Sequence, residues 1–371
     1  MIARVESVES IVDEWGQLAI SAARPTVFLT WEWLGSWLAA YRARTEHFVL
    51  AVRSHGELVG IAPFYVDLTR PRSLRLIGDG TYDSDNLGFL AKEGCLAGVT
   101  ACVLQWLAHC RNGWTILKLN AVPSEEADVI RSELQVQRWK VIAADFPHPV
   151  ISLPATWEAY LSMLSPNMRS SINRKLKKFE QENIRLTRCD DIGDLDGFLS
   201  ALFNIHDKHW RARNQKGAFS LPGRKDFFRR VATRSSQKGW LDFWALEIGG
   251  SAVALEFGFT YAGTYSFLQS GFDPAFEQSG PGVALKALVI RELIARGVRF
   301  YDFLGGGEEY KYRWGAEHRT LVNMTCAPPG SPGAAYLYLR SAVASGKARL
   351  RAHAPGLFSL LKRCFRVFRH A

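Results

Sequence analysis

The same order of expected elements occurs twice along the chain, and this repetition constrains the fold more than any other feature. Alternating apolar residues, turn signals and one helical stretch predict strands, a helix and a further strand in each half. In the first half, strands are expected within 47–66 and at 74–78, 86–90 and 114–120, with a helix over 99–110. In the second half, strands are expected at 240–248, 251–260, 263–272 and 298–304, with a helix over 281–296. The repetition indicates an α/β chain (mixed α+β) with an internal duplication.

Two domains and a tail follow from this repetition and from the length of 371 residues, which exceeds what one ordinary core holds. We expect an N-terminal domain over 1–150, a C-terminal domain over 151–330 and a tail over 331–371. The join is placed within Pro147–Pro154, where three prolines are expected to interrupt any regular element.

The positive charge of the chain is concentrated at its C-terminal end. The formal net charge is +10, but residues 331–371 hold eight of the 46 basic residues and none of the 36 acidic ones. The rest of the chain is nearly neutral, which argues against a nucleic-acid partner because such binding draws on phosphate neutralisation.

Cysteine spacing and hydropathy indicate a cytoplasmic protein. The six cysteines include no CxxC pair, so we expect neither a metal site nor a disulfide framework, and a reducing compartment fits. The N-terminus MIARVESVESIVDEW has no apolar signal core, and no apolar run is long enough to cross a membrane.

The sequence EQSGPG at 277–282 stands between an expected strand and an expected helix. The first backbone N–H groups of a helix lack partners within it, and the helix dipole favours an anion there. The segment could therefore hold a phosphate, although the same spacing is also typical of an ordinary turn. The candidate N–H donors are those of Gly280, Gly282, Val283 and Ala284.

A basic segment lies between the two halves. Seven of the 24 residues in 165–188 are Lys or Arg. The segment is either a solvated helix or a basic wall near a charged substrate or a cofactor phosphate.

Two segments of the second half carry a family resemblance. GFDPAFEQSGPG precedes the helix expected over 281–296, and GVRFYDFLGGGEEYKYRWG follows it. They resemble the GNAT acyltransferase superfamily, and more closely its tandem-GNAT group of CelD-like or FemAB-related acetyltransferases. The matching residues after the helix are Tyr301, Asp302, Phe303, Gly307, Tyr310, Lys311 and Trp314. Similarity extends over 27–325 through Trp31, Trp33, Trp37, the IAPF segment, SPNMRSSINR and HDKHW.

The resemblance implies tandem GNAT-like domains, each a mixed, mostly antiparallel sheet flanked by helices. It implies direct transfer from acetyl-CoA or another acyl-CoA, with no metal, and an acceptor such as a saccharide or an envelope polysaccharide precursor. The acyl-CoA would lie in a wedge between two strands of the second domain, with its pyrophosphate at Gln278, Ser279, Gly280, Gly282, Val283 and Ala284. The first domain would serve the acceptor or act as a lid, because its LAKEGCLAGV stretch lacks the glycine spacing.

Two carboxylates in strand-like runs are the candidate general bases, Glu256 and Asp302. Apolar neighbours are expected to raise the pKa of each carboxyl, which suits a base. The alternative is that each pairs with a buried arginine or caps a neighbouring loop.

Lys311 and His206 are the other catalytic candidates. The resemblance places Lys311 near the acceptor, where it could hold a phosphate or carboxylate or stabilise developing charge; otherwise it is an exposed loop lysine. His206 and His209 share a helix face, and with no third ligand at a known spacing a packing or acceptor-contacting role is expected rather than a metal site. The candidate substrate-binding residues are Tyr310, Trp314, Trp210, Arg169, Asn173 and Asp85, the last from the turn-like TYDSDN stretch at 81–86.

Two further functions and one further partner remain open. A FemAB-like transferase would take its acyl group from aminoacyl-tRNA. A non-catalytic GNAT-fold scaffold stays open because Glu277 and Gly280 stand where the family has other residues. The stretch 357–369 predicts a basic amphipathic helix, which either docks on its own domain or contacts an anionic membrane surface.

Overall fold

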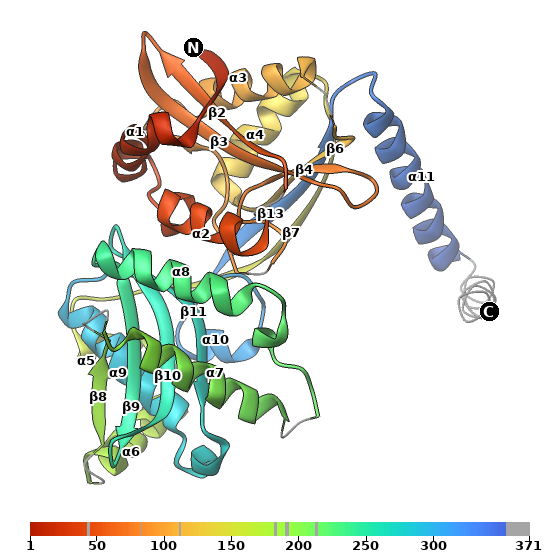
Figure 1. The fold of residues 1–371 in the computed structure, drawn as a ribbon. Helices are drawn as coiled ribbons and strands as arrows, with labels where there is room; N and C mark the ends of the chain where they lie inside the picture. The colour runs from red at the N-terminus through yellow and green to blue at the C-terminus, as the bar shows by residue number, and fades with distance from the viewer. Residues whose placement is uncertain are drawn as a thin grey trace.

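The computed structural model describes residues 1–353 except 43–44, 82, 111–112, 182–183, 190–192 and 212–213. The described residues form a 13-stranded sheet in the order β1-β2-β3-β4-β6-β13-β7-β12-β11-β10-β9-β8, with β5 added beside β3 (Figure 1). The strands are β1 (Ile2–Glu6), β2 (His47–Ser54), β3 (Glu57–Asp67), β4 (Ser73–Leu76), β5 (Leu90–Ala91), β6 (Ile116–Pro123), β7 (Lys140–Ser152), β8 (Arg185–Arg188), β9 (Leu241–Ile248), β10 (Ser251–Tyr261), β11 (Thr264–Phe272), β12 (Phe300–Asp302) and β13 (Glu317–Ala327).

Helices cover this sheet on both faces. They are α1 (Val8–Ser21), α2 (Trp31–Tyr41), α3 (Leu96–His109), α4 (Ser124–Val136), α5 (Trp157–Met163), α6 (Pro166–Gln181), α7 (Leu195–Arg211), α8 (Arg224–Gln237), α9 (Pro281–Ala295), α10 (Glu309–Arg313) and α11 (Pro332–His353). Short 3₁₀ turns lie at η1 (Val27–Leu29), η2 (Ala218–Ser220) and η3 (Pro274–Ser279). The predicted fold class, a mixed and mostly antiparallel sheet flanked by helices, is confirmed.

The internal duplication is visible in the pairing of the strands. The order β1-β2-β3-β4-β6-β13 of one half corresponds to β8-β9-β10-β11-β12-β7 of the other. Each half contains one parallel pair, β4 with β6 and β11 with β12, and all other neighbours are antiparallel. A helix forms each parallel crossover, α3 in the first half and α9 in the second, as parallel strands require.

The two halves exchange their last strands. β13, made late in the chain, pairs with β6 of the first half, whereas β7, made early, pairs with β12 of the second. β7 and β13 also pair with each other along 140–150 and so join the halves into one sheet (Figure 1). The expected boundary at residue 150 thus falls inside a strand.

The expected interruption at Pro147–Pro154 is wrong, because β7 runs through the first two of its prolines. Pro147 and Pro149 accept hydrogen bonds through their carbonyls from the N–H groups of Gly306 and Phe303. In a strand, the N–H and C=O of one residue point to the same side. An N–H group on Pro147 or Pro149 would therefore point toward the loop after β12 and away from β13. The hydrogen bonds between β7 and β13 thus lose no donor at these two prolines.

Residues 357–369, expected to form the amphipathic tail helix, lie outside the described part of the chain. Among the described residues, no helix is both long and apolar enough to span a membrane.

Candidate functional site

β11 and β12 separate after three paired residues, and the separation creates a wedge. The parallel pairing runs from Thr264 opposite Phe300 to Ser266 opposite Asp302. β12 then ends, while β11 continues to Phe272 without a partner strand on that side within the described residues. This opening lies in the second half, as the resemblance implies.

The loop at the start of α9 is covered by lysines of α6. Lys175 Nζ donates to the carbonyl of Ser279 at 3.2 Å, and Lys178 Nζ donates to Ser279 Oγ at 3.1 Å. Gly280 has a left-handed φ of 70°, which favours glycine, and a Cβ there would meet the end of the Lys175 side chain, which would have to move aside. Of the two interpretations of the basic segment, the geometry favours a basic wall beside this loop.

Several of the N–H groups expected to bind a phosphate are already used within the loop. The N–H of Gly280 donates to Glu277, and those of Val283 and Ala284 both donate to the carbonyl of Gly280. Gly282 N–H has no protein acceptor among the described residues. Gln278 and Ser279 lie at the surface of the same loop, where Gln278 is exposed and Ser279 is partly exposed.

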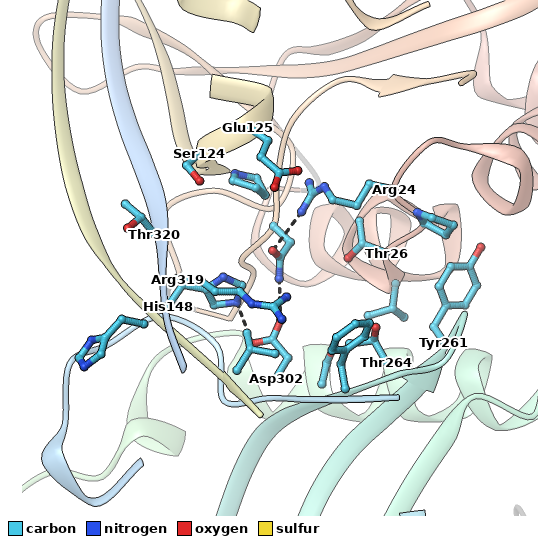
Figure 2. A pocket seen from close by; sticks show the side chains of 18 residues that line it. Arg24, Thr26, Ser124, Glu125, His148, Tyr261, Thr264, Asp302, Arg319 and Thr320 are labelled. Carbon is cyan, nitrogen blue, oxygen red and sulfur yellow. Dashed lines mark hydrogen bonds and ion pairs between the residues drawn. The ribbon is translucent and has the colours of Figure 1, made fainter. Parts of the chain in front are cut away.

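A pocket of about 620 Å³ lies between the two halves, on one face of the sheet (Figure 2). Its floor includes Ser266 and Asp302, the last paired residues before the wedge. The other lining residues come from both halves, and they are Arg24, Pro25, Thr26, Val27, Asn86, Pro123, Ser124, Glu125, His148, Val150, Tyr261, Thr264, Phe300, His318, Arg319 and Thr320.

Asp302 is buried at this floor and fully hydrogen-bonded. Its Oδ1 accepts from His148 Nε2 at 2.8 Å and from Leu304 N–H at 2.7 Å, and its Oδ2 accepts from Asn86 Nδ2 at 2.9 Å. Burial alone would raise the pKa of Asp302, but the His148 contact and the other donors outweigh it and hold the pKa below its ordinary value. The expected rise in its pKa is therefore wrong, because the sequence neighbours are apolar but the spatial neighbours are donors.

A chain of polar contacts connects Asp302 to the first half. Asn86 Oδ1 accepts from Arg24 at 3.3 Å, and Arg24 Nε donates to Glu126 at 3.0 Å. Figure 2 shows Arg24, His148 and Asp302 around the pocket, with the contact of His148 to Asp302 as a dashed line. Asn86 is thus held from both ends of its amide.

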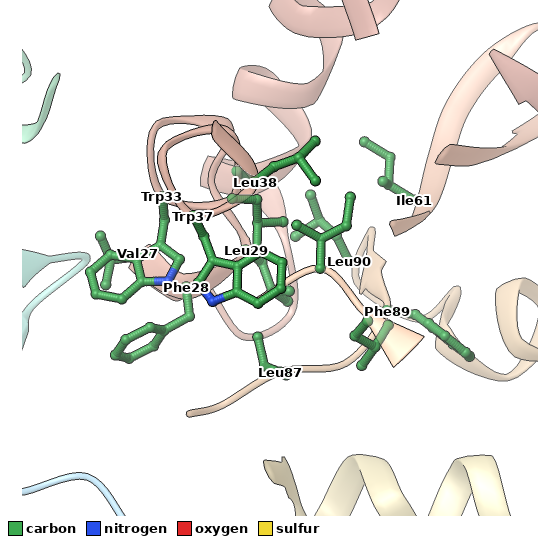
Figure 3. Close-up of a cluster of buried hydrophobic side chains, with 14 of the residues drawn as sticks. Val27, Phe28, Leu29, Trp33, Trp37, Leu38, Ile61, Leu87, Phe89 and Leu90 are labelled. Carbon is green, nitrogen blue, oxygen red and sulfur yellow. The ribbon is translucent and has the colours of Figure 1, made fainter. Parts of the chain in front are cut away.

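The loop that carries Asn86 is anchored by the aromatic helix α2. Trp33 Nε1 donates to Ser84 Oγ at 2.8 Å, and Trp37 Nε1 donates to Thr81 Oγ1 at 2.7 Å. Figure 3 shows both tryptophans in a buried cluster with Leu87, which follows Asn86. Since indole N–H groups need partners when buried, the tryptophans fix this loop as well as the core.

Glu256 lies on the opposite face of the sheet from Asp302. It is 1% exposed and accepts from Lys286 Nζ at 2.8 Å, from Tyr301 at 2.7 Å and from Tyr265 at 3.2 Å. Tyr301 precedes Asp302 in β12, so their side chains point to opposite faces. The two candidate bases therefore do not share one site, and Glu256 pairs with a buried lysine where an arginine was the alternative.

Lys311 lies beneath the glycine turn that follows β12. Only 4% of its side chain is exposed, and Nζ donates to the carbonyls of Leu304 and Gly305 and pairs with Glu308 at 3.0 Å. It is thus not an exposed loop lysine. Asp85 accepts from Gly305 N–H at 2.7 Å, and burial, opposed by that contact, raises the pKa of its carboxyl. The structure brings Asp85, Lys311 and Asp302 to one loop.

His206 lies apart from this group. It is buried in α7, where Trp210 Nε1 donates to its Nε2 at 3.0 Å, and burial lowers its pKa to about 4. Its helix packs beside Gly271 of β11, five positions beyond Ser266. A packing role for both His206 and Trp210 fits these contacts.

The remaining candidates are divided between two places. Trp314 is buried and accepts from Tyr160 through its carbonyl, and Tyr310 is 37% exposed beside Phe303. Arg169 and Asn173 instead line a shallow surface of α6. Within the described residues, no group of three or more His, Cys, Asp or Glu side chains is placed to hold a metal ion.

Two residues of the site, His148 and Arg24, were not predicted from the sequence, nor was Lys286 on the opposite face of the sheet. His148 lies in PHPV, where the prolines concealed the strand, and Lys286 is a single cation inside an apolar helix. A charged residue within an otherwise apolar helix face predicts a buried partner of opposite charge, since a buried charge is tolerated only when it is paired.

Residues 166–312 match the family model described as an acetyltransferase (GNAT) domain. No curated protein matches the chain. Among solved structures, the chain is similar to FemX, with a TM-score of 0.66 and 10% identity over 88% of this chain and 97% of that one.

A domain of a putative lysylphosphatidylglycerol synthetase and the protein L-PGS are also similar in structure. The C-terminal domain (DUF2156) of a putative synthetase from Agrobacterium fabrum gives a TM-score of 0.56 at 9% identity, over 90% of this chain and 95% of that one. L-PGS from Bacillus licheniformis gives 0.55 at 12% identity, over 91% and 97%. Likeness at such identities shows a shared fold that spans both halves.

Proposed function

We propose that the protein is an acyltransferase that moves an acyl group directly from acyl-CoA to an amine or hydroxyl acceptor. The observation that carries this proposal is the geometry of the second half: the strands β11 and β12 diverge, and beyond the opening α9 begins at a loop covered by two lysines. The match of residues 166–312 to a GNAT acetyltransferase domain covers the same elements.

The residues at this loop fit a pyrophosphate. Lys175 and Lys178 place two cations over Ser279, Gly282 keeps a backbone N–H, and the α9 dipole adds to the attraction. Burial, with the charges of Arg174 and Lys178, lowers the pKa of Lys175. An anion bound among these cations would relieve their mutual repulsion.

The pocket between the halves fits the acceptor. It meets the wedge at Ser266 and Asp302, so an acceptor bound there approaches the point where the strands separate. Its lining offers the hydroxyl groups of Thr26, Ser124, Tyr261, Thr264 and Thr320. Such a surface supports a polar acceptor of the saccharide class, for which hydroxyl groups and aromatic rings are ordinary contacts.

Calorimetric titration with acetyl-CoA tests the donor. We expect micromolar binding to the wild type and at least about tenfold weaker binding to Lys178→Glu. A hydrogen bond to a charged group contributes about 1.5–3 kcal/mol, and about 1.4 kcal/mol corresponds to a tenfold change in affinity. Lys177→Glu is the matched control, because Lys177 is an exposed neighbour on α6 that lines a different surface. Equal weakening by both variants would show a general charge effect and count against this loop.

If neither acetyl-CoA nor longer acyl-CoAs bind, the proposed function fails, and the two remaining candidates are a tRNA-dependent transferase and a non-catalytic scaffold. Transfer from aminoacyl-tRNA, abolished by RNase, would identify a tRNA-dependent transferase. Acceptor binding with no donor of either kind would identify a scaffold.

A further inference from the structure

The strand register places a histidine next to Asp302 in the pocket. Val150 of β7 is opposite Asp302, and His148 is opposite Arg319 of β13. Side chains two apart on a strand share a face, so His148 and Asp302 face the pocket together. Only 8% and 5% of their side chains are exposed.

The contacts of Asp302 fix which nitrogen of His148 carries the proton. A carboxylate that is ionised only accepts hydrogen bonds, and Leu304 N–H, Asn86 Nδ2 and His148 Nε2 all contact it. The imidazole therefore donates through Nε2, and in its neutral form Nδ1 holds the lone pair. This arrangement, a histidine oriented by a buried carboxylate, is that of a general base.

We propose that His148, oriented by Asp302 at the floor of the pocket, takes the proton of the acceptor amine or hydroxyl during acyl transfer. This inference rests on the proposed function. The acceptor N–H or O–H proton moves to Nδ1 as the new bond to the acyl carbon forms. The C–S bond of the thioester breaks, and the CoA thiolate takes up the proton of the imidazolium, directly or through solvent, which restores neutral His148.

The first half acts on this pair through a positioning residue, Asn86. Its amide donates to Asp302 and accepts from Arg24, which Glu126 holds in turn. Rotating the amide would set its oxygen against the carboxylate and its NH₂ against a guanidinium, so only one orientation is satisfied. The first half is thereby part of the reaction site, beyond serving as a lid.

Nitrogen NMR of the imidazole ring tests the orientation without any substrate. We expect the neutral ring of His148 to carry its proton on Nε2, and Asp302→Asn or Asn86→Ala to give a mixture of tautomers. Assignment uses the signal lost in His148→Gln. A proton on Nδ1 in the wild type would overturn the proposal, because that nitrogen could not accept another.

Thiol release from acetyl-CoA tests the proton transfer, with amino sugars as acceptors. We expect His148→Ala to reduce kcat by about 100- to 10,000-fold, with acetyl-CoA affinity unchanged and activity partly restored by added imidazole. Asn86→Ala should lower kcat with KM unchanged. Hydroxylamine, a nucleophile that is neutral at pH 8, should react nearly as fast with His148→Ala as with the wild type.

The controls separate this inference from the proposed function. His109→Ala alters an exposed histidine of α3 that does not line the pocket and should be as active as the wild type. If the wild type binds acetyl-CoA and His148→Ala turns over amino sugars within threefold of it, the role of His148 is refuted while the acyltransferase remains. If no acyl-CoA binds, the proposed function fails.

Discussion

The ion pair of Lys286 and Glu256 offers the sharpest test of what holds the second half together. Both side chains are almost fully buried, at 7% and 1% exposure, and lie between α9 and the sheet. Lys286 Nζ also donates to Tyr301 at 2.5 Å and lies 3.9 Å from the centre of the Phe267 ring. Burial, opposed by the carboxylate, lowers the pKa of the ammonium group.

Lys286→Met should leave Glu256 as an uncompensated buried charge, which costs about 3–5 kcal/mol. Glu256→Gln keeps an acceptor for Lys286 but removes its counter-charge, at about 1.5–3 kcal/mol. The double variant carries no buried charge and keeps the two tyrosine hydroxyls bonded, so it should be more stable than Lys286→Met alone by about 2 kcal/mol or more.

Urea unfolding followed by tryptophan fluorescence measures these differences, and thiol release measures activity. Additive effects, with the double variant as unstable as the sum of the singles, would refute the pairing argument. Loss of turnover in Glu256→Gln at unchanged stability would make Glu256 the base and would remove that role from His148.

Two further predictions concern stability. Burial lowers the pKa of His206 to about 4, against about 6.5 in the unfolded chain. The free energy of unfolding should therefore fall by up to about 3 kcal/mol as the pH falls from about 6.5 to about 4. His206→Gln should abolish this part of the pH dependence of the urea midpoint, whereas a change of the exposed His47 to Gln should retain it. Arg224 and Tyr41 hold the buried Asp83 at 2.7 and 2.6 Å across the α2–α8 contact between the halves. Arg224→Met should therefore lower the free energy of unfolding by about 3–5 kcal/mol. Arg230→Met, which removes an exposed pair with Asp226, should lower it by less than about 1 kcal/mol. Equal losses for the two variants would contradict a stabilising role of the buried Arg224–Asp83 pair between the halves.

The repeated order of elements could be predicted because its signals are local. Gly249-Gly250 marks the hairpin between β9 and β10, and Pro281 marks the first turn of α9. The glycine loop before α9 could be located for the same reason, since its glycines and the helix start are adjacent in sequence.

The partners of the buried charges could not be predicted because they are distant in sequence. Asp302 meets His148 from 154 residues away and Asn86 from 216, so its apolar neighbours indicated a pKa shift of the wrong sign. Likewise, whether Pro147 breaks a strand depends on which edge its missing N–H faces, and that is decided by β13 and the loop after β12.

The exchange of β7 and β13 sets an order of completion during synthesis. β7, the strand at the end of the second half's sheet, has already been synthesised when the ribosome reaches β8. The second half, the second unit, can therefore complete its sheet once β12 has emerged. The first unit must wait for β13, and until then the edge of β6 remains an unpaired template for aggregation. The unit that is translated first is therefore finished last, and a nascent chain stalled before residue 317 exposes the edge that the full chain covers.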